Sequence, residues 1–189
     1  MKKFNTLIVA LLLTGGAFAQ TWTVDKSHAK LSFEITHFMI SDVDGAFTSF
    51  DAKITSSKED FSDAVIELTA DAASINTASE GRDKHLKNED FFDVEKFKTL
   101  SFKSTSLKLV EGKKYKLTGD LTMHGVTKQV ELDATFTGPI VHPYNKKTVA
   151  GLKIAGVVKR SDFGIGAKYP SAALGEEVII KANGEFVKN

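Results

Sequence analysis

Apolar and polar residues alternate along most of the chain after residue 20. The clearest example is residues 31–36, where three polar residues separate the apolar positions Leu31, Phe33 and Ile35. A period of two residues is typical of a β-strand with one face on the core and the other in water. The same pattern predicts seven further strands, at 46–54, 64–70, 100–104, 115–121, 126–137, 148–159 and 177–187.

Glycine-containing pairs mark the expected turns. We expect turns at Gly45, Glu111-Gly112, His124-Gly125 and Gly138-Pro139, because glycine accepts positive φ and proline interrupts strand pairing. Alternation within 46–54 places Phe47 on the face opposite to that of its neighbours.

One short segment, Glu80–Lys87, has the features of a helix. Ser79 is a good N-cap residue, but a helix of this length is not stable alone in water. We therefore expect Leu86, Phe91 and Phe92 to hold it against the sheet. A single short helix on about eight antiparallel strands predicts an all-β barrel or sandwich, and barrel closure removes exposed strand edges.

Residues 1–19 have the pattern of a cleaved secretory signal peptide. Lys2 and Lys3 precede the apolar run 7–13, and Ala17-Phe18-Ala19 is a small-x-small cleavage site. We expect cleavage after Ala19, a single domain of residues 20–189 and an exported product. No later apolar stretch has the length of a membrane span.

Composition narrows the classes of function. Hydrophobic residues make up 42% and charged residues 26% of the 189 positions, which is typical of a globular protein. Lys and Arg number 25 against 24 Asp and Glu, so the basic excess of a nucleic-acid binder is missing. The chain has no cysteine, which excludes disulfides, thiolate metal sites and a cysteine nucleophile.

The remaining polar residues give no strong catalytic or metal signature. The five histidines show neither HxH nor HxxxH spacing, so we predict no metal site and no cofactor. The chain has no G-x-S-x-G elbow, so we predict that it is not an enzyme. A hydrolase that uses a serine with His28 or His37 and an aspartate is the weaker alternative.

The 14 phenylalanines, against a single tryptophan, raise the question of what fills the barrel. They can form an ordinary packed core. An eight-stranded barrel is also near the size that leaves room for one ligand, and small residues such as Ala52, Ala70 and Gly119 favour a cavity. A completely filled barrel would instead suit an interaction module without a ligand.

Eight short motifs occur in a characteristic order between Trp22 and Phe186. They are Trp22-Thr-Val-Asp25 with Ser27-His28, Phe33-Glu-Ile-Thr-His37-Phe38, Asp44-Gly45-Ala-Phe47, Ser74-Ile75-Asn-Thr77, Arg82-Asp83-Lys-His85-Leu86, Asp90-Phe91-Phe92-Asp93, Gly119-Asp-Leu121-Thr122-Met-His-Gly125-Val-Thr127, and Arg160-Ser-Asp162-Phe163-Gly164. In this order they resemble the YceI-like family of exported, lipocalin-like polyisoprenoid-binding proteins. Phe97-Lys98 departs from the family, which usually has proline after the aromatic residue.

The resemblance implies an eight-stranded antiparallel lipocalin-like barrel with a short helix near its mouth and an apolar tunnel. The implied partner is a polyisoprenoid, such as a polyprenyl phosphate or quinone, or another long-chain lipid. It also implies a periplasmic location and allows a homodimer. The residues expected to line the tunnel are Phe33, Ile35, Phe38, Phe50, Leu68, Phe91, Phe92, Leu100, Phe102, Leu121 and Phe163.

Three polar residues are candidates for the mouth of the tunnel. His37 continues the inward face of 31–35, so it points into the barrel near the mouth or is a hydrogen-bonded core histidine. Arg82 and His85, three residues apart on the helix, can hold an anionic headgroup between them. Alternatively, Arg82 and Asp83 fix the loop as an ion pair or cap. We read Asp162-Phe163-Gly164 as a strand-ending turn with Phe163 inward.

Overall fold

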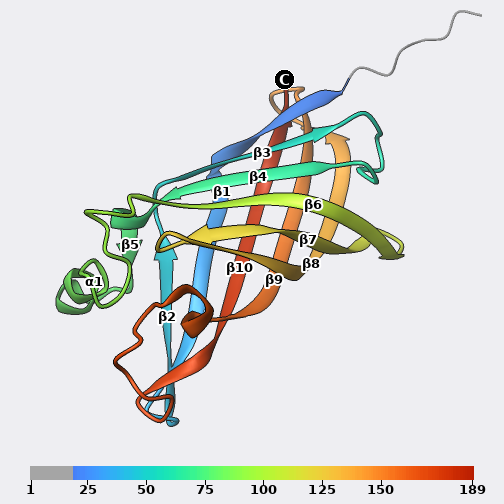
Figure 1. Ribbon diagram of the computed structural model, residues 1–189. Coiled ribbons are helices and arrows are strands. Elements are labelled where there is room, and N and C mark those ends of the chain that lie inside the picture. The colour runs from blue at the N-terminus through green and yellow to red at the C-terminus, as the bar shows by residue number, and fades with distance from the viewer. Residues whose placement is uncertain (1–18) are drawn as a thin grey trace, which may run out of the picture.

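The computed structural model describes residues 19–189. Residues 1–18, which are all but the last residue of the predicted signal peptide, lie outside this part. Ten strands form one antiparallel sheet with a short helix at one end (Figure 1). The strands are β1 (Gln20–His37), β2 (Ser41–Phe47), β3 (Phe50–Ser56), β4 (Val65–Asp71), β5 (Ile75–Asn76), β6 (Thr99–Glu111), β7 (Lys114–Met123), β8 (Val126–Val141), β9 (Thr148–Lys159) and β10 (Leu174–Lys188). The helices are α1 (Glu80–Leu86) and the 3₁₀ turns η1 (Ala72–Ser74) and η2 (Arg160–Phe163).

The sheet closes on itself. β10 pairs with both β9 and β1, which joins β10, β9, β8, β7, β6, β4, β3 and β1 into a closed eight-stranded ring. The predicted eight-stranded antiparallel barrel is therefore confirmed. Closure removes the edges that an open sheet would present to other chains.

The long first strand has different neighbours at its two ends. Residues 20–23 of β1 pair with β3, whereas residues 31–37 pair with β2. Between these parts the register with β10 shifts, so that residues 25–28 stand opposite Glu185. An insertion of this kind bends a strand and increases its twist. It lets β1 contribute to two differently built ends of the barrel.

Two predicted turns are strand residues instead. Gly45 lies inside β2, opposite Phe33, and the chain reverses at residues 38–40. The pair Gly138-Pro139 lies inside β8, where the register with β9 shifts between Thr137 and Ile140. Gly45 allows a close approach of its partner Phe33, and Gly138-Pro139 lies at an irregularity within a strand. The sequence pattern does not distinguish these roles of glycine and proline from a turn.

The predicted strand 46–54 is two strands. It is interrupted at Thr48 and Ser49, whose backbones bond to the segment 71–74. The alternation therefore restarts at Phe50, and Phe47 is buried rather than turned away from the core. The prediction for Phe47 was wrong because a period of two holds only within one uninterrupted strand.

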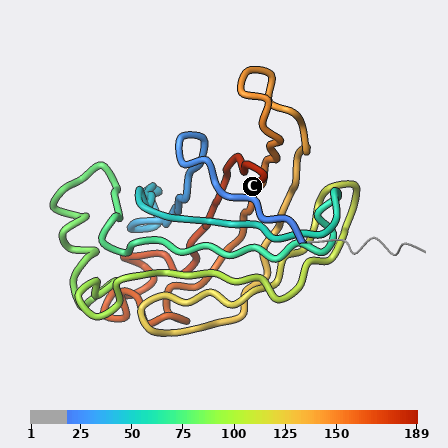
Figure 2. The backbone as a smooth tube through the Cα atoms, turned by 90° about the horizontal axis from the view of Figure 1, so that it is seen from above, coloured from blue at the N-terminus to red at the C-terminus, as the bar shows by residue number. Residues whose placement is uncertain are grey.

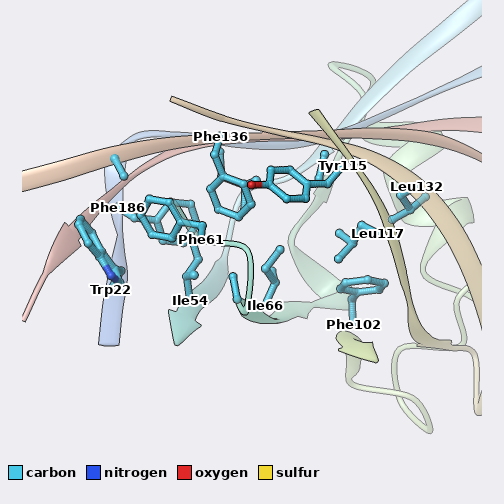
Figure 3. Close-up of a cluster of buried hydrophobic side chains, with 14 residues drawn as sticks. Trp22, Ile54, Phe61, Ile66, Phe102, Tyr115, Leu117, Leu132, Phe136 and Phe186 are labelled. Carbon is cyan, nitrogen blue, oxygen red and sulfur yellow. The ribbon is translucent and has the colours of Figure 1, made fainter. Parts of the chain in front are cut away.

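The barrel interior contains two buried clusters. The first, which we call the filled cluster, comprises Trp22, Ile54, Phe61, Ala64, Ile66, Phe102, Tyr115, Leu117, Leu132, Ala134, Phe136, Ala150, Leu152 and Phe186. Figure 3 shows its rings packed across the interior. Phe61 stacks on Phe136 with centroids 4.7 Å apart, and Trp22 and Tyr115 meet these rings edge-on. The interior at this end is occupied by side chains.

The second cluster lies at the end that carries α1 and η2, and we call it the open cluster. It comprises Phe47, Ala70, Ala72, Ile75, Phe91, Leu100, Met123, Val158, Phe163 and Ile165. Leu68, Leu121, Val130 and Ile180 contact both clusters and lie between them.

The helix is close to its predicted position. It ends at Leu86, one residue early, and Ser79 is the N-cap residue without a side-chain cap bond. As expected, Leu86 and Phe92 pack against the open cluster, to which the buried Phe91 belongs. The strand-ending turn is also confirmed, because Phe163 is buried and Gly164 has a φ of 69°.

Candidate ligand-binding site

An apolar cavity of about 350 Å³ occupies the end of the barrel that contains the open cluster. This volume is at the lower end of the range of small-molecule sites, roughly 300–1,000 Å³. Its walls come from β1, β2, β6, β7, β9 and β10, and it is covered by α1, the segment after α1 and the loop 164–174, whose last residue begins β10. The apolar lining residues of the strands are Phe33, Ile35, Val43, Phe47, Leu100, Met123, Val158, Val178 and Ile180.

The structure brings most of the predicted site residues together. The lining includes six of the predicted tunnel residues and all three predicted mouth residues. These are Phe33, Ile35, Phe38, Phe91, Phe92, Leu100, His37, Arg82 and His85.

Five predicted tunnel residues lie outside this lining. Phe50 and Leu68 face a separate space of about 20 Å³, and Phe102 belongs to the filled cluster. Leu121 lies between the two clusters, and Phe163 is buried in the open cluster without reaching the cavity. All five are on inward faces or buried, so alternation placed them inside the barrel but did not tell which end was hollow.

Several lining residues were missed from the sequence. Val178 and Ile180 follow the period of two in the predicted strand 177–187, so that signal was present. Phe47 was hidden by the interruption after β2. Ile165 and Tyr169 come from the loop 164–174, which has no periodic pattern.

Arg160 holds this loop in place. Its side chain is only 4% exposed. It donates hydrogen bonds of 2.7–3.2 Å to five backbone carbonyl oxygens. The acceptors are Ile165, Gly166, Tyr169, Leu174 and Gly175. Five donors in a planar fork are what only arginine offers, so one side chain fixes the whole loop.

Glu176 balances part of the Arg160 charge at 3.7 Å. Hydrogen bonding by Ser161 holds the pKa of Glu176 below its ordinary value, and the nearby guanidinium adds to this effect. The Arg160 guanidinium is therefore engaged with the protein itself, although it borders the cavity.

Tyr169 connects the loop to the helix across the mouth. Its hydroxyl lies 3.1 Å from Nε2 of His85, and its ring stacks on Phe91 with centroids 5.2 Å apart. His85 meets the Phe91 ring edge-on at 5.0 Å. These three rings place a polar pair, hydroxyl and imidazole, at the border of an otherwise apolar cavity.

Arg82 and Asp83 fix the loop before the helix. Arg82 donates from Nε and Nη2 to the hydroxyl and carbonyl oxygens of Thr77, each at 2.8 Å. Thr77 in turn donates from its amide and hydroxyl to Asp83 at 2.8 and 2.6 Å. The loop-fixing alternative is therefore present in the structure, and headgroup contact by Arg82 stays a prediction.

His37 lies at the rim of the cavity. It is exposed, and its ring meets Phe38 edge-on at 4.2 Å. The alternative of a buried core histidine was therefore wrong, because β1 ends at His37 and the chain leaves the barrel there.

A separate polar group lies on the irregular part of β1, away from the cavity lining. Asp25 accepts from the amide and hydroxyl of Ser27 at 3.0 and 2.6 Å, and its other oxygen lies 2.9 Å from Nδ1 of His28. These bonds lower the pKa of Asp25 to about 2, with those from Ser27 contributing most, and Asp25 raises the pKa of His28. Within residues 19–189, Asp25, His28 and Glu185 are the group whose ligand atoms could share a metal ion.

This group does not have the geometry of a hydrolase triad. In a triad the serine and the carboxylate contact opposite nitrogens of the imidazole. Here Nδ1 of His28 faces both Ser27, at 3.3 Å, and Asp25. The ring therefore has no second contact through which a proton could pass from the serine to the carboxylate side.

No helix in residues 19–189 is long and apolar enough to cross a membrane.

Comparison with known proteins agrees with the geometry of the barrel. A family model described as the YceI-like domain matches residues 22–186. The UPF0312 protein SA2479 of Staphylococcus aureus is 34% identical over 169 residues, which are 87% of this chain and 96% of that protein.

Solved structures with this fold are also known. The Campylobacter jejuni YCEI protein is 29% identical with a TM-score of 0.73, covering 82% of this chain and 90% of that one. A polyisoprenoid binding domain from Saccharophagus degradans has a TM-score of 0.68, covering 89% of this chain and 98% of that one. Its identity is 12%, so this likeness concerns the fold alone.

Proposed function

The chain belongs to the YceI-like family, and from this we propose that it binds a polyisoprenoid or a similar long-chain amphiphile in the barrel. The observation that carries the proposal is the apolar cavity between β1, β2, β10 and α1, which has polar side chains only at its border. A site of this kind accepts an apolar chain and leaves a polar end near the mouth.

The driving force is the removal of the apolar chain from water. Each buried methylene contributes about 0.8 kcal/mol before the entropy of association is subtracted. A chain of several isoprene units therefore gains ample free energy from any smooth apolar wall. Selectivity must come from the polar end, where the Tyr169 hydroxyl and the His85 imidazole border the cavity.

The direct test is to extract the purified protein with organic solvent and identify released molecules by mass spectrometry. Native mass spectrometry then gives the stoichiometry. We expect one long-chain species per barrel, taken up during production or from added lipid in detergent. If the protein releases no lipid and binds none that is added, the alternative of an interaction module without a ligand is favoured instead.

Two adjacent valines on β9 provide a matched pair of variants. Val158 is buried and lines the cavity, whereas Val157 is 52% exposed on the outer face. Val158→Phe fills part of the cavity and should reduce the amount of bound lipid. Val157→Phe makes the same change outside and should leave loading unaltered. Equal loading in both variants would contradict the assignment of the cavity.

Export to the periplasm is part of the same proposal. It is supported by the signal-like pattern of residues 1–19. The mass of the protein recovered from the periplasm should correspond to residues 20–189. A protein that retains residues 1–19 in the cytoplasm would contradict export.

A further inference from the structure

Three consecutive large apolar residues form the turn between β1 and β2. Phe38, Met39 and Ile40 are 57%, 67% and 85% exposed. Scattered apolar residues are common on protein surfaces, but a contiguous exposed group marks an interaction site more often.

Bulky side chains are unexpected in this turn because of its backbone conformation. Phe38 and Met39 have φ angles of 50° and 58°, and the Ile40 amide donates to the His37 carbonyl at 3.2 Å. Positive φ at two central residues is the pattern of a type I′ turn, which favours Asn-Gly. Bulky residues are uncommon at positive φ. Local backbone preference therefore does not account for Phe-Met, and departures of this kind concentrate at functional sites.

The turn is continuous with the mouth of the cavity. Phe38 itself belongs to the cavity lining, and its amide donates to the Ala173 carbonyl at 2.9 Å. Figure 1 shows the turn and the segment after η2 together at the end of the barrel opposite to the C-terminus. Whatever contacts this tip also lies against the entrance to the cavity.

Charge and size favour a lipid bilayer as the contacting surface. Neither residues 38–40 nor the loop 164–174 contains an acidic residue, and Lys168 is the one charged residue in these two segments. The first carboxylate after the turn, Asp42, accepts from the Thr36 hydroxyl at 2.8 Å. A stable protein interface takes roughly 20–30 residues from each partner, far more than a three-residue tip supplies. The tip itself carries no charged residue, and carboxylates near it, such as Asp42 and Asp90 (2.6 Å from Lys168 Nζ), are already bonded within the protein. An apolar tip of this kind suits shallow insertion among lipid headgroups and acyl chains.

We propose that Phe38, Met39 and Ile40 insert into a lipid bilayer and so dock the mouth of the barrel on the membrane. The role of docking in cargo exchange rests on the proposed lipid-binding function. Docking itself is a separate property, because Met39 and Ile40 lie outside the cavity lining and the tip can contact vesicles that contain no cargo.

The test measures cosedimentation of the purified protein with phosphatidylcholine vesicles, with and without phosphatidylglycerol. The triple variant Phe38→Asn, Met39→Gly, Ile40→Ser supplies the residues that the turn backbone prefers, so we expect it to fold. Removing three inserted apolar side chains should weaken partitioning at least about tenfold. The parent and the variants share the same N-terminal residues, so a difference in vesicle partitioning between them comes from the turn.

A matched control removes exposed apolar residues elsewhere. Ile140, Val141 and Tyr144 are 59%, 63% and 89% exposed on the β8–β9 hairpin, which projects from the body in Figure 2. The hairpin residues Asn145 and Lys147 share a groove with the C-terminal Lys188 and Asn189, at the end opposite to the turn. Replacing Ile140, Val141 and Tyr144 by serine should leave vesicle partitioning unchanged.

The outcomes separate docking from cargo binding. Equal partitioning of the parent and the turn variant, or an equal loss in the hairpin control, would overturn the docking proposal. The docking proposal would also be overturned if the parent does not bind vesicles but forms a stoichiometric complex with a protein through the turn. The double variant Met39→Gly, Ile40→Ser keeps the cavity-lining Phe38, so it should lose vesicle partitioning but retain loading from detergent. If the parent takes up no lipid during production or from detergent, the proposed function is contradicted. The vesicle measurement would still decide whether the turn docks on a membrane.

Discussion

The ring of Phe33 lies directly over the backbone of Gly45, its partner on the neighbouring strand β2. A Cβ atom added at Gly45 would be 2.2 Å from Cζ of Phe33. The absence of a side chain at Gly45 therefore lets the Phe33 ring lie against the wall and leaves space in the cavity. This is an example of an aromatic ring covering a strand glycine.

Gly45→Ala should displace the Phe33 ring and reduce the room for lipid. Overpacking of this kind costs about 1–3 kcal/mol of stability. Chemical denaturation and the amount of bound lipid are the measurements. Gly151→Ala is the control, because its Cβ would lie 3.5 Å from the Thr137 side chain, an ordinary contact. Equal stability of the two variants would contradict the proposed packing.

Arg160→Lys should loosen the loop 164–174. An ammonium has three donors and cannot reach five carbonyl groups, so several buried acceptors lose their partner. We expect a loss of about 3 kcal/mol or more in urea unfolding. Hydrogen exchange should increase in the loop first. Lys159→Ala, an exposed neighbouring change, should have little effect; unchanged exchange in Arg160→Lys would argue against the anchoring role.

Arg82→Ala should weaken the loading of anionic and neutral lipids by the same factor. The reason is that two guanidinium nitrogens already bind Thr77, so the variant loosens the loop rather than removing a headgroup contact. Asp83→Asn weakens the other side of Thr77 and should give a similar result. A selective loss of anionic lipids in Arg82→Ala alone would show that Arg82 contacts the headgroup.

The pair Asp25 and His28 should titrate outside the ordinary ranges. The pKa of Asp25 is lowered to about 2, so its contribution to stability is complete above pH 4 and is lost as the pH falls through 2. The pKa of His28 is raised, so its contribution is present below its ordinary pKa of 6.5 and is lost as the pH rises through the raised value.

Nuclear magnetic resonance titration checks both directions. In Asp25→Asn the pKa of His28 should return toward 6.5, because its main partner has lost its charge. Ser27→Ala should raise the pKa of Asp25 by removing the hydroxyl donor. A His28 pKa that is the same in the parent and in Asp25→Asn would contradict the interaction.

Local patterns in the sequence were sufficient for the class of fold and for much of the wall of the barrel. Alternation identified strands such as that containing Phe33 and Ile35, because a period of two follows directly from strand geometry. The helix that follows Ser79 and the turn at Gly164 also depend on residues adjacent in the sequence, and both were predicted correctly. The ordered motifs led to the YceI-like family, which the family match confirms.

Tertiary structure alone decided which half of the interior is hollow. Phe102 and Phe33 both lie on inward strand faces, yet Phe102 belongs to the filled cluster and Phe33 lines the cavity. Likewise, Arg160 could be recognised as an anchor only when the loop 164–174 was placed around it. Alternation reports the side of a strand that a residue occupies. Whether space remains there depends on the volumes of residues far apart in sequence that meet across the barrel.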